Sequence, residues 1–505
     1  MLLVKFRRYY LGIFCTAIAI LAFLVSSYFL GSFNHFDPWT GAKLYPSFAT
    51  LNFTDLYNQT CAPFILTVYG PCASFFYLPA TLGNDPESSM WIAYSLNILT
   101  LVVFTCSIFV FLPKKLCLIY QFGAISFLFF LTFEKTTISL FQIHYDLPAL
   151  FFFFLFLLLL KKTKRSNLTI FLCLSFLWLT VWTKITALPW LLLPIILKIF
   201  RSYDDSLINK FSATKIIFYQ SLSGILILLI FGFLYGFNDL YFHLIETTNN
   251  YPWRECTSLF GSNHEMVLND DISSKLFSLF SLTFSYLEEY WWMFCSCLGI
   301  IFYQLRRRED STVLTWLSLS YFLVLPTCLS ALAKFGGVEN SLVFAHFFGL
   351  LSIFLQASLL IDKNISSPFS KKIIMGLSLI LFSTISLRHS VTCLRNTSNS
   401  PQQLAYEFSL LNPDIPIFFP MSPQINYLTN NKIYDSGEAL TYATMMKQDS
   451  LPENAGLDFM QHTDLIAFGN PPYSRSYFYR KLNLTKIVSP GGLEDWNIYK
   501  AERKD

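Results

Sequence analysis

The stretch IHYDLPALFFFFLFLLLLKK, residues 143–162, contains the pattern that decides the fold. An uncharged apolar run follows Asp146 and ends at Lys161 and Lys162. A helix that crosses the hydrocarbon core of a bilayer, roughly 30 Å thick, needs about 20 such residues. Because Lys and Arg mark the cytoplasmic ends of these helices, we place the two lysines inside, and His144 and Asp146 at the outer mouth.

Similar apolar runs recur along most of the chain. Hydrophobic residues make up 54% of it and charged residues only 13%, far from the average of soluble proteins. Helices satisfy their own backbone polar groups in lipid, so we predict an α-helical polytopic membrane protein with about 11 transmembrane helices. The run 168–200 is too long for one crossing and is read as a hairpin. The other predicted spans are 11–30, 91–112, 116–133, 168–182, 187–200, 216–236, 276–304, 313–332, 342–361 and 373–387.

Basic clusters alternate with the spans and set the predicted topology. With a cytoplasmic N-terminus, the clusters at 161–165 and 306–308 fall inside, as the positive-inside rule requires. The outer loops 31–90, 134–142, 237–275 and 333–341 then belong to a transmembrane domain, residues 1–391. Their only cations are Lys43, Lys135, Arg254, Lys275 and Lys334. The net charge of +4 therefore reflects topology, and we expect no nucleic-acid partner. The sequence also has no Gly-rich phosphate loop, zinc spacing or nucleophile elbow.

The chain changes character near residue 392. Residues 392–505 have no apolar run long enough to span a membrane and are rich in Asn, Pro, Asp and Ser. Short apolar runs at 415–419, 465–468, 486–488 and 496–499 alternate with helix-like stretches at 402–411 and 438–447. This pattern favours a small extracytoplasmic α/β domain.

The first outer loop contains a carboxylate at the membrane surface. In HFDPWTGAKLYP, residues 35–46, Asp37 is followed by Pro38 and Trp39. One interpretation is a polar helix end beside an interfacial Trp. The other is a site residue, because YGPCASFFYLPA, residues 69–80, begins with Tyr69 and is too apolar for a free loop, which suggests an interfacial helix.

Further charged groups are expected at the same depth. Glu134 lies in the second outer loop, and Asp146 follows His144 at the start of a span. Acids beside hydrocarbon are costly and tend to be functional, although Asp146 before Leu147–Pro148 also fits a helix N-cap. The candidate cations are Lys184, Lys334 and Arg254.

These motifs together resemble the GT-C glycosyltransferases. A carboxylate after the first span, the Y-G-P stretch, an acidic second loop, a K-x-T before a proline-bearing span, and K-F-G-G-x-x-N in a late loop carry the resemblance. It implies sugar transfer from a polyprenyl-phosphate carrier with inversion of configuration. Asp37 matches the first-loop catalytic carboxylate, and Glu134 and Asp146 compete for the second-loop acid. The paired acids of the family are absent, which weakens the argument for a metal-bridged site.

The chemistry of glycosyl transfer suits the same residues. A base must take the acceptor proton, and cations must hold the departing phosphate. We assign Asp37 as base, Lys184, Lys334 and Arg254 to the phosphate, and Trp39, Tyr69 and His144 to the substrate cavity.

Several choices stay open at this stage. No cofactor is certain, and a divalent metal ion remains an alternative to the cations. The acceptor is a lipid, glycan or protein, and the bacterial inner membrane is favoured over the endoplasmic reticulum. A lipid-linked polysaccharide polymerase or ligase, and a transporter or flippase, are the rival functions. Mid-membrane acids and internal repeats would favour the transporter, and the sequence has neither.

Overall fold

The computed structural model describes most of the chain between residues 38 and 504. The described residues are 38–57, 64–65, 68–111, 118–131, 134–161, 166–199, 207–250, 252–253, 272–307, 312–334, 339–364, 400–437, 440, 455–469, 475–491 and 493–504. The predicted spans 11–30 and 373–387, Asp37, Arg254 and the predicted domain boundary at residue 392 lie outside them.

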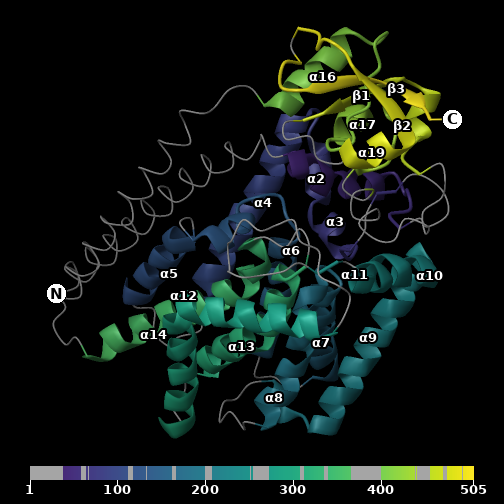
Figure 1. Cartoon of the computed structure of the whole chain (residues 1–505). Coiled ribbons are helices and arrows are strands. Elements are labelled where there is room, and N and C mark those ends of the chain that lie inside the picture. The colour runs from purple at the N-terminus through teal and green to yellow at the C-terminus, as the bar shows by residue number, and fades with distance from the viewer. Residues whose placement is uncertain are drawn as a thin grey trace, which may run out of the picture.

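Long apolar helices form the body of the molecule (Figure 1). Within the described residues, four are long and apolar enough to cross a membrane: Pro86–Phe109, Ala213–Tyr235, Val313–Leu332 and Asn340–Asp362. Three shorter apolar helices are Asp146–Leu160, Asn167–Val181 and Ile185–Ile199. The elements of this part are α4 (Pro86–Cys106), η3 (Ser107–Phe111), α5 (Leu118–Leu131), α6 (Asp146–Leu160), α7 (Asn167–Val181), η5 (Ile185–Leu192), α8 (Leu193–Ile199), α9 (Ala213–Tyr235), α12 (Ile272–Arg307), α13 (Thr312–Leu332) and α14 (Val343–Asn364).

Each predicted span within the described residues coincides with a helix, whereas the total of eleven crossings stays a prediction. The doubtful run 168–200 is divided as expected, because α7 ends at Val181 and the chain resumes as the 3-10 helix η5, with Pro189 inside it. Helix α12 is kinked at Tyr290, whose backbone dihedrals are non-helical.

Aromatic side chains pack helices α6, η5 and α14 against one another. The fully buried Trp190 of η5 lies with its ring centroid 4.3 Å from that of Phe153 on α6. The same ring lies 5.0 Å from Phe344 and 5.1 Å from Phe348, both on α14. Large aromatic side chains contribute most of the buried area in such a core, so α6, η5 and α14 are fixed against one another.

Short helices connect these elements. Helix α4 begins with a capping box, in which Asp85 accepts a hydrogen bond from the Ser88 amide, followed by Pro86 at its first position, a strong start signal. The connecting elements are α2 (Pro38–Leu51), α3 (Cys72–Phe76), η2 (Leu78–Leu82), η4 (Lys135–Leu140), η6 (Ile208–Lys210), α10 (Phe237–Leu240), η7 (Tyr241–Glu246), α11 (Thr247–Asn250) and η8 (Glu339–Leu342).

A small α/β unit at the C-terminal end lies beside α2 and α4 (Figure 1). It has a three-stranded antiparallel sheet in the order β1-β3-β2, with Ile466 opposite Tyr499 and Leu484 opposite Ala501. Its elements are α16 (Pro401–Leu411), α17 (Gln424–Asn430), η10 (Asp458–Gln461), β1 (Leu465–Phe468), α19 (Arg475–Lys481), β2 (Leu482–Lys486) and β3 (Asn497–Arg503).

The strands agree only in part with the sequence pattern. The runs at 465–468 and 496–499 correspond to β1 and β3, but β2 ends at Lys486, where the predicted strand begins. The run 415–419 is not a regular strand. It makes a single bridge, between Phe418 and Ile466, since Pro416 cannot donate a ladder hydrogen bond.

Candidate functional site

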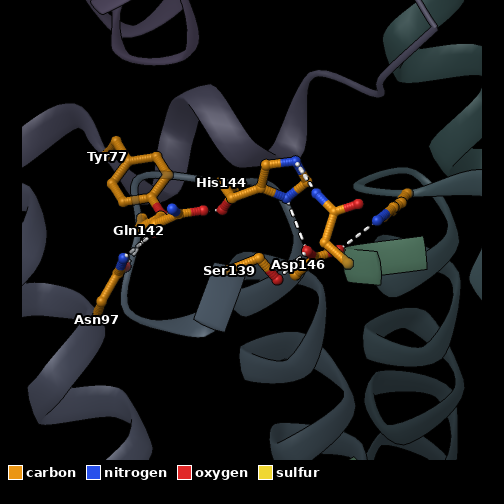
Figure 2. A network of polar contacts seen from close by, with 8 residues as sticks. Tyr77, Asn97, Ser139, Gln142, His144 and Asp146 are labelled. Carbon is orange, nitrogen blue, oxygen red and sulfur yellow. Dashed lines mark hydrogen bonds and ion pairs between the residues drawn. The ribbon is translucent and has the colours of Figure 1, made fainter. Parts of the chain in front are cut away.

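Asp146 is the centre of a buried polar cluster. It opens α6 and its side chain is 0% exposed. Ser139 Oγ donates a hydrogen bond to Asp146 Oδ2 at 2.7 Å, and His144 Nδ1 lies 2.7 Å from the same oxygen. The Lys184 ammonium forms an ion pair with the other carboxylate oxygen, Oδ1. Figure 2 shows His144, Ser139 and Asp146 meeting above the start of the helix.

The capping interpretation of Asp146 is wrong. Tyr145 occupies the N-cap position of α6, and this helix has no side-chain cap hydrogen bond. Asp146 is the first helical residue, where a carboxylate interacts favourably with the helix dipole. Its two oxygens are directed to Ser139, His144 and Lys184 instead.

Lys184 reaches Asp146 from the break between α7 and η5. Its amide donates to the Thr180 carbonyl at 3.1 Å, so the backbone is held by the end of α7. Its ammonium also lies 5.4 Å from the centroid of the Phe344 ring, a cation–π distance. The lysine predicted from the K-x-T motif is therefore in the cluster.

His144 is held by its backbone as well as by its ring. The Tyr77 hydroxyl lies 3.0 Å from both the His144 carbonyl and Asn97 Oδ1, while Asn97 Nδ2 donates to the Gln142 carbonyl at 2.7 Å (Figure 2). Asn340 Nδ2 lies 3.3 Å from His144 Nε2. With the proton on Nδ1, Nε2 accepts from Asn340, whereas Nδ1 lies 2.7 Å from Asp146 Oδ2 without the geometry of a hydrogen bond.

Glu134 belongs to a second cluster. Its Oε1 accepts hydrogen bonds at 3.2 Å from Tyr290 and Thr136, and lies 3.6 Å from His346 Nδ1. Burial opposes ionisation of this carboxyl, but the hydrogen bonds and charge of His346, with the two hydroxyls, hold its pKa below the ordinary value. The segment η4 thus carries Thr136 to one cluster and Ser139 to the other.

Lys43 lies beside this cluster and is not among the site residues predicted from the sequence. It is buried on α2, with its ammonium 4.8 Å from the ring centroid of Tyr69 and 5.0 Å from that of Tyr145. The ring of Tyr69 in turn lies edge-on to His144, at 6.2 Å between centroids. The available signal was its place six residues after Asp37, in a loop with few cations.

Lys334 contacts a different element. Its ammonium donates to the carbonyl of Thr248 on α11, and its backbone forms an isolated bridge with Trp253. Burial, and to a lesser extent the charge of Lys275, lowers the pKa of Lys334. Its assignment to the donor phosphate stays a prediction. So do the assignments of Asp37, Arg254 and the Trp39 side chain, which are not among the described groups.

The described residues contain no group of three or more His, Cys, Asp or Glu side chains arranged to hold a metal ion. The observed cluster instead has one carboxylate that contacts a lysine and a histidine. Such an arrangement can fix a cation and an imidazole in place for contact with an anionic group.

Two solved structures share this architecture. Crystal structures of ArnT from Cupriavidus metallidurans superpose with TM-scores of 0.54, for the form bound to undecaprenyl phosphate, and 0.50, for the apo form. The former alignment covers 97% of each chain at 9% identity, and the latter 98% of each at 8%.

This chain has the ArnT fold. The sequence motifs predicted a helical membrane fold with a small C-terminal α/β unit, and this is the fold that the chain shares with these structures. No protein-family model matches the chain, and no curated protein matches it in sequence. At these identities the similarity to ArnT establishes the fold, and the activity is argued from the site.

Proposed function

We propose that this protein is a membrane glycosyltransferase that transfers a sugar from a polyprenyl-phosphate carrier to an acceptor on the extracytoplasmic face. The observation that carries the proposal is the buried Asp146–Lys184–His144 cluster within a fold shared with ArnT, a protein whose crystal structure has undecaprenyl phosphate bound.

The charge of the cluster suits a phosphate ligand. Lys43 and Lys184 contribute two positive charges, and Asp146 contributes one negative charge; the charges of both lysines act on His144. A glycosyl phosphodiester carries one negative charge and leaves as a phosphate with more. Ammonium groups held in a water-poor site stabilise such developing charge strongly. We therefore assign Lys184 and Lys43 to the donor phosphate, with Lys334 and Arg254 as further candidates.

The roles of the acids differ under this proposal. Asp146 is fully buried and both its oxygens have partners, so we assign it to positioning Lys184 and His144. Asp37, directly before α2 in the sequence, remains the proposed general base. Attack of the activated acceptor hydroxyl opposite the phosphate inverts the anomeric configuration. Glu134, in its separate cluster, remains the alternative second-loop acid.

The partners follow from the same scheme. The donor is a polyprenyl-phosphate-linked sugar, the acceptor is a lipid, glycan or protein, and the protein is integral to the bacterial inner membrane. The C-terminal α/β unit disfavours the polymerase or ligase alternative, for which we expect no soluble tail. The position of Asp146 at a helix end disfavours a transporter, which would be expected to have mid-membrane acids.

The test is a transfer assay with the purified protein in lipid nanodiscs. A panel of polyprenyl-phosphate sugars is supplied and release of the lipid phosphate is measured. We expect release with at least one donor, and a loss of about 10²–10⁴-fold for Asp37→Asn. No release with any donor and acceptor pair, from protein that retains its fold, would contradict the proposal.

A further inference from the structure

Helix α2 makes contacts on two opposite sides. Gly41, Tyr45 and Phe48 are spaced by four and three residues and so lie on one side of the helix. Lys43 is two residues from Gly41 and two from Tyr45, so it projects from the opposite side. The first side makes the contacts with the C-terminal unit, and the rings of Tyr45 and Phe48 also pack among membrane-domain residues. Lys43 meets the rings of Tyr69 and Tyr145.

The contacts of the first side are close and buried. Gly41 lies so near Gln424 that an added Cβ would come within 2.3 Å of its Nε2. The Tyr45 hydroxyl donates to the Tyr434 carbonyl at 2.9 Å and accepts from the Tyr434 amide at 2.8 Å. The ring of Phe48 packs 5.3 Å from that of Tyr427.

The C-terminal unit holds the same outer loop at a second point. The Phe64 amide donates to Asp435 Oδ1 at 2.6 Å, and the Ser436 amide donates to the Phe64 carbonyl at 2.7 Å. The other oxygen of Asp435 accepts from the Gly456 amide at 3.0 Å. The Phe64 side chain is buried in the core of the C-terminal unit, beside Phe418 and Phe459.

Other residues of the same loop, Tyr57, Tyr69 and Gly70, lie close to the cluster around Asp146. The Tyr57 hydroxyl donates to the Tyr69 carbonyl at 2.5 Å. Gly70 follows and lies so close to the Trp182 carbonyl that any Cβ would clash, at 1.5 Å. Its amide donates to the carbonyl of Thr183, the neighbour of Lys184. These contacts join Tyr57, Tyr69 and Gly70 of the loop to Thr183, next to Lys184.

We infer that the C-terminal unit positions the donor-phosphate site: Tyr434 and Asp435 hold α2 and Phe64 from the outside, and this fixes Lys43 over Tyr69 and Tyr145. Tyr45 and Asp435 are thus positioning residues that act through Lys43. The expected change in donor kinetics rests on the proposed function. The claim that the C-terminal unit holds α2 in place does not.

The experiment pairs hydrogen exchange with donor kinetics on the full-length protein in nanodiscs. Tyr45→Phe removes both hydrogen bonds to Tyr434, and Asp435→Ala removes the acceptor for the Phe64 amide. Asp435→Asn is the conservative variant, because its amide oxygen still accepts from the Phe64 amide, and it loses only the hydrogen bond from the Gly456 amide, which lies within the C-terminal unit. Tyr321→Phe is the matched control, since it likewise deletes a buried tyrosine hydroxyl, which in the described core lies 3.0 Å from the Tyr286 hydroxyl.

We expect amide exchange in residues 41–51 to accelerate at least tenfold in Tyr45→Phe and Asp435→Ala, and to stay near wild type in Asp435→Asn and Tyr321→Phe. The donor KM should rise and kcat/KM should fall by about 10–100-fold in the first two variants, as expected for misplacement of a binding group. Unchanged exchange in both would overturn the inference. Faster exchange with unaltered donor kinetics would overturn the positioning role. An inactive wild type would count against the proposed function, while the exchange result still decides whether the C-terminal unit holds α2.

Discussion

The ion pair between Asp146 and Lys184 gives the sharpest test of how the cluster is built. We consider Asp146→Asn, Lys184→Met and the double variant. Asp146 is fully buried and the Lys184 side chain is 11% exposed. Each single change therefore leaves the charge of the other residue without its partner and with little water to hydrate it. Met matches the length and apolar stem of Lys, and Asn matches the shape of Asp, so the changes report mainly on charge.

The expected magnitudes follow from these contacts. Breaking a buried ion pair by removing one member typically destabilises by about 3–5 kcal/mol. Asn keeps a carbonyl oxygen that accepts from Lys184, so we expect the lower end, about 3 kcal/mol, for Asp146→Asn. Lys184→Met leaves a carboxylate that still contacts Ser139 and His144, so about 2 kcal/mol is expected. The double variant leaves neither charge unpaired, and we expect it to lose no more than about 3 kcal/mol, a coupling of roughly 2 kcal/mol.

The assay is equilibrium unfolding in mixed detergent micelles, with the four proteins compared under one condition. A sum of single effects equal to the double effect within about 0.5 kcal/mol would refute the reasoning, because the two charges would then not depend on each other. In the transfer assay, all three variants should lose activity, since the double variant removes the unpaired charge without restoring the cation.

Three further outcomes are expected. Lys43→Met should raise the donor KM by roughly tenfold, as loss of one charge-assisted contact of about 1.5 kcal/mol implies; an unchanged KM measured by lipid-phosphate release would remove Lys43 from the phosphate site. Gly70→Ala should destabilise the protein by more than about 2 kcal/mol, because its Cβ would meet the Trp182 carbonyl at 1.5 Å, and thermal unfolding in detergent checks this. Burial, with the charge of Asp458 adding to it, raises the pKa of Asp435 to about 7. The folded protein then binds a proton that the unfolded chain releases near pH 4, so stability should fall as pH rises from about 4 to 7, by up to about 4 kcal/mol, and Asp435→Asn should flatten this pH dependence.

The helical part of the fold could be predicted because its signal is local. Apolar runs of the right length with basic ends are visible in a single sequence, and α6, with its uncharged run after Asp146, is the clearest case. The C-terminal strands were predicted less well, since a single Pro416 removes one of them and the register of β2 depends on pairing with β3. Strand pairing is a tertiary property that short apolar runs do not specify.

The site could be predicted only where the residue type itself was unusual for its surroundings. Asp146, His144 and Lys184 were found because charge beside hydrocarbon is costly. Lys43 was missed because a lysine in an outer loop is ordinary, and its burial depends on α2 lying between Tyr145 and the C-terminal unit. The sequence also could not show that Glu134 and Asp146 belong to separate clusters, since this depends on which face of η4 meets α14.

The Asp146 carboxylate limits how strongly the neighbouring ammonium group can bind a phosphate. An ammonium that is already paired with a carboxylate offers a phosphate less than a free one does, so Lys184 alone would be a weak anion site. Lys43 adds a second ammonium to the cluster, held against the rings of Tyr69 and Tyr145 by cation–π contacts. The lysine whose position depends on the C-terminal unit is therefore the second cation that the cluster can present to a phosphate. Under the proposed function, donor binding then requires the extracytoplasmic unit as well as the membrane helices.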